Sequence, residues 1–174
     1  LGVYYLIGLE GSIYLYRRLS QNRSIGRTIA RAGLLSWVVL VAAFWILGAK
    51  AYARDVQVIE TQMVETAKWA EEHLPTNSRI AVHDIGAMGY FTNHNIIDLA
   101  GLINPEVIPF LRDESRLAEY LDQNDVDFLI CFPQWYPALT RDLTVIHVAD
   151  SAVMQEFGEP PMTIFRWRLN RFIR

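Results

Sequence analysis

The chain has 174 residues, and its formal net charge of −3 at pH 7 hides two unlike parts. Residues 1–50 hold six Lys or Arg and one acid, whereas residues 51–174 hold ten Lys or Arg and eighteen Asp or Glu. The acidic C-terminal part argues against a nucleic-acid partner, because it would repel a polyanion.

An uncharged stretch of eighteen residues, 32–49, lies between Arg31 and Lys50. A helix of this length covers about 27 Å, close to the roughly 30 Å hydrocarbon core of a bilayer. Trp37 and Trp45 lie toward its two ends, as aromatic rings prefer at membrane interfaces. The stretch therefore predicts a membrane-spanning helix.

Another apolar segment, residues 1–16, precedes this stretch, and we expect it to be the end of an earlier span. Five arginines follow it in the segment 17–31: Arg17, Arg18, Arg23, Arg27 and Arg31. The positive-inside rule places this Arg-rich loop in the cytoplasm, where it can also contact anionic lipid headgroups. We expect a membrane segment over residues 1–54 of a multi-pass plasma (inner) membrane protein, with residues 55–174 outside the cytoplasm.

From about residue 55, helical and extended patterns alternate, which predicts a small three-layer α/β domain with a mixed, parallel-rich sheet. Apolar positions at helical spacing predict a helix from Asp55 to Leu74, ended by Pro75. Asp113 is expected to cap a second helix. Strands are expected at 79–83, 95–99, 127–132, 143–148 and 163–169. Residues 163–169 alternate as in a half-exposed edge strand.

Candidate binding residues follow the first two predicted strands. His83 and Asp84 come after the first strand, and Asp98 comes at the end of the second. Ligands of open α/β sheets usually bind at the carboxyl ends of strands, so these groups are candidates for recognising sugar hydroxyls or for acid–base chemistry. The structural alternative is that Asp84 caps a short helix beginning at Ile85.

An aromatic turn follows the third predicted strand and contains Trp135 and Tyr136. These rings can stack on a sugar, dip into the membrane interface, or pack over the end of the sheet. The single Cys131 excludes an internal disulfide and is expected to be a small buried hydrophobe.

Patterns for cofactors and metals are missing from the sequence. His83, its neighbour Asp84 and the nearby His94 could be considered as metal ligands. Adjacent strand residues such as His83 and Asp84 point to opposite faces, however, which argues against a metal site here. The glycines after Asp84 do not form a dinucleotide fingerprint, and there is no G-x-S-x-G elbow. We therefore expect no metal and no cofactor.

Three motifs support a family resemblance: a Trp69 to Pro75 helix end, DIG-x-x-GYF at 84–91, and IIDLAGL at 96–102. Together they make roughly residues 64–137 similar to the C-terminal extracytoplasmic segment of bacterial GT-C-type membrane glycosyltransferases, the protein-mannosyltransferase-like group. The resemblance implies a multi-span enzyme that transfers a sugar from a polyprenyl-phosphate-linked donor to an acceptor at the outer membrane face.

The catalytic acid of that family lies in an upstream loop, so the resemblance assigns no catalytic residue to this sequence. The 174 residues by themselves are expected to be inactive. The alternative is a non-enzymatic, membrane-anchored extracytoplasmic module that binds a glycan or a protein, because this role needs only the anchor, the acidic domain and the aromatic turn.

Overall fold

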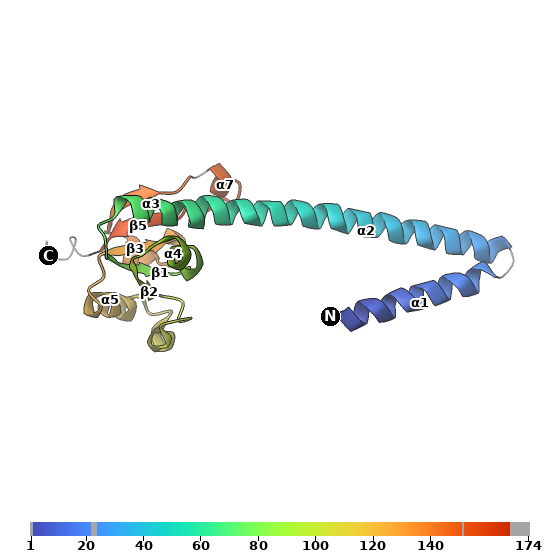
Figure 1. Ribbon diagram of the computed structural model, residues 1–174, viewed down its shortest axis with the longest axis horizontal. Coiled ribbons are helices and arrows are strands. Elements are labelled where there is room, and N and C mark those ends of the chain that lie inside the picture. The colour runs from blue at the N-terminus through green and yellow to red at the C-terminus, as the bar shows by residue number, and fades with distance from the viewer. Residues whose placement is uncertain (1, 22–23, 151, 168–174) are drawn as a thin grey trace. The chain divides into compact units, whose positions relative to one another are not determined.

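The computed structural model describes residues 2–21, 24–150 and 152–167 (Figure 1). The chain forms two compact units, Leu1–Ala53 and Arg54–Arg174. Each unit is described by itself.

The N-terminal unit consists of helix α1, Gly2–Ser20, and most of helix α2, Ser24–Val58. Apolar side chains of α2 are exposed, including Phe44 at 74% and Trp45 at 79%. Helical structure continues from Ser24 to His73. Within the described residues, this is the one helix long and apolar enough to cross a membrane by length and composition.

Helix α1 has no uncharged stretch as long as that of α2, because Glu10, Arg17 and Arg18 interrupt its apolar residues. A second span over residues 1–16 is therefore not shown. The segment 17–31, expected to be a loop, is largely helical: α1 extends through Ser20 and α2 begins at Ser24. Arginine is a good helix former, so a cluster of arginines does not by itself interrupt a helix.

In the C-terminal unit, the helix predicted to end before Pro75 is present. It passes through a π-helical segment, η1 (Ile59–Val64), into α3 (Glu65–His73), and the backbone becomes extended at Leu74. Proline disfavours the helical conformation of the residue before it, which explains this end.

A five-stranded sheet follows, with the order β2-β1-β3-β5-β4. Its strands are β1 (Arg79–Val82), β2 (Asn95–Asp98), β3 (Phe128–Cys131), β4 (Thr144–Val148) and β5 (Thr163–Arg166). Strand β1 is parallel to β2 and β3, and β5 is antiparallel to β3 and β4. Four of the five strands therefore run in the same direction, and the sheet is mixed and parallel-rich, as predicted.

The prediction of an edge strand at 163–169 was wrong. Strand β5 lies inside the sheet, with β3 on one side and β4 on the other. Ile164 is 0% exposed and packs in one core, while Phe165 is 4% exposed and packs in the other. Alternation of apolar and polar residues shows that the two faces of a strand have different surroundings. It does not show whether the strand has neighbours on both sides in the sheet. The edge strand on this side of the sheet is β4, and residues 168–169 lie outside the described part.

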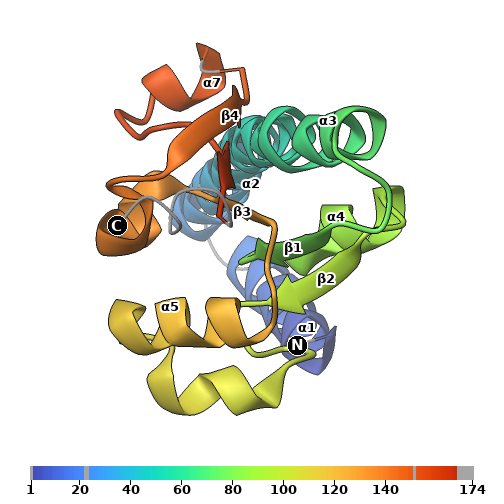
Figure 2. The same ribbon diagram turned by 90° about the vertical axis from the view of Figure 1, so that its left-hand side faces the viewer.

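Helices cover both faces of the sheet, and successive strand residues therefore enter different cores (Figure 2). Ile80 and Val82 pack with α3 and with α4 (Ile85–Phe91), whereas Ala81 packs with α5 (Glu114–Gln123). Asp113 caps α5 as predicted, accepting hydrogen bonds from two backbone N–H groups at 3.1 Å.

The carboxyl ends of the co-directional strands lie at the end of this unit where the chain enters at Arg54. Glu156 and Phe157 follow β4 and the short helix α7 (Ala152–Gln155). The Arg54 guanidinium contacts Glu156 Oε2 at 2.6 Å and lies 4.4 Å above the Phe157 ring.

Candidate functional site

The sheet has one topological switch point that involves its parallel strands. From β1 the chain passes to β2 on one side, and it then crosses to β3 on the other side of β1. Ligands of open α/β sheets bind in the crevice outside the strand ends at such points. His83 directly follows β1, and Phe132–Tyr136 follow β3.

His83, Trp135 and Tyr136 come together at this switch point, and we call them the strand-end cluster. His83 Nδ1 is 2.6 Å from the Tyr136 hydroxyl, and its ring meets the Trp135 ring edge-on with centroids 4.6 Å apart. Partial burial lowers the pKa of His83, and the charges of Asp84 and Asp98 act in the opposite direction. The imidazole is therefore favoured in its neutral form.

The two aromatic members of the cluster differ in exposure. Tyr136 is buried, and this burial raises the pKa of its hydroxyl. Trp135 belongs to η3 (Pro133–Trp135), also contacts Phe132, and remains 48% exposed. Tyr136 thus holds the His83 ring, while about half of the Trp135 side chain is left at the surface.

Asp84 lies beside the cluster but is engaged by helix α4. Its Oδ1 accepts a hydrogen bond from the Gly86 backbone N–H at 3.1 Å, which is the geometry of an N-cap. The capping interpretation of Asp84 therefore fits the structure.

Asp98 is fully buried and organises the loop after β2. Its two carboxylate oxygens accept hydrogen bonds from the backbone N–H groups of Ala100 and Ile103, both at 2.7 Å. Gly101 in this loop has a φ of +78°, and a Cβ there would lie 2.7 Å from Ile108. The carboxylate is thus a structural centre rather than an exposed reactive group.

Other titratable groups lie apart from the cluster or are unreactive. His94 Nε2 is near the Ala70 carbonyl on α3, at 3.3 Å, rather than near His83. Burial raises the pKa of the Cys131 thiol to about 12, as expected for a buried hydrophobe. Across the described ranges, no group of three His, Cys, Asp or Glu could hold a metal ion.

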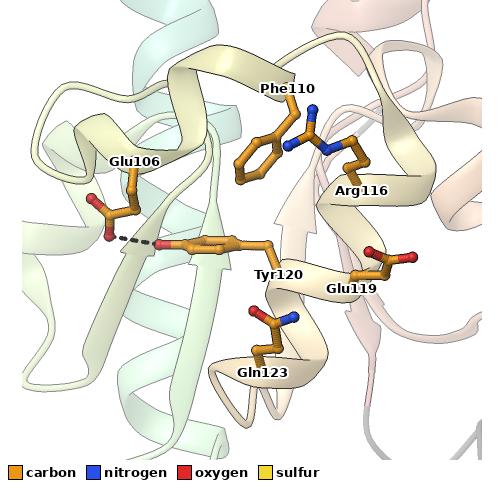
Figure 3. A pocket seen from close by; sticks show the side chains of 6 residues that line it. All are labelled: Glu106, Phe110, Arg116, Glu119, Tyr120 and Gln123. Carbon is orange, nitrogen blue, oxygen red and sulfur yellow. Dashed lines mark hydrogen bonds between the residues drawn. The ribbon is translucent and has the colours of Figure 1, made fainter.

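The sequence interpretation missed a second group of polar and aromatic side chains, which line a pocket between α5 and η2, the 3-10 helix Pro105–Phe110 (Figure 3). We call it the η2–α5 pocket, and its lining residues are Glu106, Phe110, Arg116, Glu119, Tyr120 and Gln123. Its helical half is visible in the sequence as positions i, i+3, i+4 and i+7 from Arg116. The half from η2 has no such signal.

A family model described as a domain of unknown function, DUF8728, matches residues 42–168, which is most of the chain. No curated protein and no solved structure matches it.

Proposed function

The chain belongs to the DUF8728 family, a domain of unknown function, and we propose that it is the C-terminal part of a polytopic membrane glycosyltransferase. The whole enzyme transfers a sugar from a polyprenyl-phosphate-linked donor to an acceptor at the outer membrane face. Its catalytic acid lies upstream of this sequence. The α/β unit is a non-catalytic extracytoplasmic domain.

One observation carries the non-catalytic role: the carboxylates that the sequence offers after β1 and β2 are engaged by backbone N–H groups. Asp84 caps α4, and Asp98 holds its loop from a fully buried position. A catalytic carboxylate needs an oxygen within hydrogen-bond reach of the reacting hydroxyl. This arrangement fits an enzyme whose catalytic acid lies elsewhere better than one that uses Asp84 or Asp98 as the acid.

The membrane location is supported by charge and by exposure. The uncharged stretch 32–49 keeps apolar side chains such as Phe44 and Trp45 exposed, as a lipid-facing helix does. Arginines precede this stretch and an acidic unit follows it, which favours an extracytoplasmic C-terminal domain. The reaction class in this proposal comes from the resemblance of roughly residues 64–137 to GT-C-type enzymes.

The first test is to read the gene upstream of Leu1 and to assay the full-length protein with a polyprenyl-phosphate-linked sugar. We expect further spans with an acidic residue in an early loop, and transfer by the full-length protein. Replacing Asp84 by Asn should leave transfer unchanged. Transfer by residues 1–174 alone would contradict a catalytic acid upstream.

A second candidate function is favoured by the strand-end cluster. Trp135 is half-exposed beside a His83 ring held by Tyr136, which suits a membrane-anchored module that binds a glycan or a protein without catalysis. A start codon close to Leu1 would support this module and remove the transferase.

A further inference from the structure

The η2–α5 pocket has a volume of about 330 Å³, within the range of small-molecule sites. Four of its residues form one stripe of α5, and the buried Leu117 and Leu121 lie on the opposite face of that helix. Figure 3 shows the stripe facing Glu106 and Phe110 of η2. Packing of α5 on the sheet thus leaves a polar and aromatic stripe at the surface.

Hydrogen bonds hold the centre of the pocket in place. The Tyr120 hydroxyl donates to Glu106 Oε1 at 3.0 Å, and the Asn104 side-chain amide donates to the same oxygen at 3.0 Å. The Phe110 and Tyr120 rings have centroids 5.7 Å apart. Hydrogen bonds, first from its own backbone N–H and then from Asn104 and Tyr120, lower the pKa of Glu106, so it is a carboxylate at neutral pH.

The charges in the pocket select among ligand classes. The Arg116 guanidinium already lies 4.9 Å over the Phe110 ring, where a cationic ligand would stack. The carboxylates of Glu106 and Glu119 repel phosphates and other anions. A purely apolar ligand would leave the polar lining without partners. A neutral ligand with several hydroxyl groups satisfies all three conditions.

We propose that the η2–α5 pocket binds a neutral sugar ring. The C–H face of the sugar packs on the aromatic ring of Tyr120, because Arg116 already covers the Phe110 ring. Its hydroxyls donate to Glu119 and accept from the Gln123 amide and from Arg116. This inference rests on the proposed function only for the source of the sugar. In that function, the bound sugar belongs to the acceptor.

The test is saturation-transfer NMR with the full 174-residue chain in a detergent that has no sugar head group. The probes are glucose, mannose, galactose, N-acetylglucosamine and, for comparison, spermidine. Inorganic phosphate has no C–H protons, so it is tested by whether it displaces a bound sugar and reduces the sugar's signal. We expect at least one of the four sugars to bind, and the two charged probes not to bind. Binding of none of the sugars, or tighter binding of phosphate or spermidine, would overturn the proposal.

Variants then locate the site. Gln123→Ala and Glu119→Ala each remove an exposed side chain and should weaken sugar binding about tenfold or more, as expected for the loss of a good hydrogen bond. Tyr90→Ala is the matched control, because Tyr90 is 82% exposed and lies outside the pocket. Circular dichroism should show all three variants folded. Unchanged binding in Gln123→Ala and Glu119→Ala would place the sugar elsewhere.

The outcomes separate this inference from the proposed function. Sugar binding at the pocket, with no transfer by the full-length protein, leaves the inference standing and removes the glycosyltransferase. Transfer by the full-length protein, with no sugar bound by the chain, removes the inference alone.

Discussion

Asp98 has its carboxylate in the interior of the domain, whereas the Asp84 carboxylate is only partly buried. Asp84 follows β1 and Asp98 ends β2. Both carboxylates accept hydrogen bonds from backbone N–H groups a few residues later in the chain. The difference is that Asp98 uses both oxygens at 2.7 Å, and a buried acceptor has no water to replace a lost partner. Two aspartates with similar sequence contexts therefore have different energetic roles.

Replacing Asp98 by Asn should lower the free energy of unfolding by about 2–3 kcal/mol, because an amide NH₂ would face one of the two backbone donors. Asp84→Asn is the matched control, since Asn caps helices as well as Asp does, and it should change stability by less than about 0.5 kcal/mol. Urea unfolding of the two variants measures both values. Equal effects would contradict the structural role of Asp98.

The lowered pKa of His83 predicts a pH dependence. In the unfolded chain its pKa is about 6.5, so the unfolded state takes up a proton at a higher pH than the folded state does. The stability from the neutral ring is complete above about pH 7 and decreases as the pH falls through about 6.5 toward the lower folded pKa. NMR titration of the His83 ring should show a midpoint below about 6.5. A midpoint at or above that value would contradict the prediction.

Other titratable side chains also contribute to the pH dependence of stability. Burial also lowers the pKa of His147, so His83→Gln should remove only part of the loss of stability, and adding His147→Gln should remove more. Glu71 and Glu106 also have lowered pKa values, but their contributions are lost only as the pH falls below about 4.5. The loss of stability from the two histidines therefore begins at a higher pH than the loss from the two glutamates.

At the scale of elements, the long helix is joined to the sheet region through its π-helical segment η1. Gln62 in this segment is fully buried, donates to the Asp150 carbonyl at 2.7 Å and accepts from the Met162 backbone N–H at 2.9 Å. These partners flank the connection between β4 and β5. One side chain therefore fixes the helix against a segment about 90–100 residues later.

Replacing Gln62 by Leu should destabilise the C-terminal unit by about 2–4 kcal/mol, because the buried Met162 N–H and the partly buried Asp150 carbonyl would lose their Gln62 partner. Gln57→Leu makes the same change at an exposed position of the same helix and should stay within about 0.5 kcal/mol of the parent. Chemical unfolding of the full chain in detergent provides the comparison. A small effect at Gln62 would mean that water reaches these groups.

At the scale of the whole molecule, the separation of charge follows the division into units. The unit that contains the apolar stretch has six Lys or Arg and one acid, whereas the α/β unit has ten Lys or Arg and eighteen acids. This distribution predicts that the two ends of the apolar stretch lie on opposite sides of a membrane, with the acidic unit outside.

Cysteine labelling of the full-length protein in intact cells tests this orientation. Thr76→Cys, in the exposed turn before β1, should react with an impermeant maleimide, whereas Ser24→Cys, at the start of α2, should react only after the cells are permeabilised. The native Cys131 is buried, with a thiol pKa of about 12, and adds little background. The reverse labelling pattern would contradict an extracytoplasmic domain.

The sequence by itself determined the apolar stretch, the α/β class, the positions of all five strands to within a few residues, and the cap at Asp113. It offered the cap at Asp84 only as an alternative to ligand binding. These features depend on local periodicity, on proline and on short-range hydrogen bonds, which a single segment contains. Only the tertiary structure decided that β5 lies inside the sheet, that His83 meets Tyr136, and that Asp98 is buried. It also formed the η2–α5 pocket from two segments. Such features depend on contacts between residues far apart in the chain, and no local pattern specifies which partners meet.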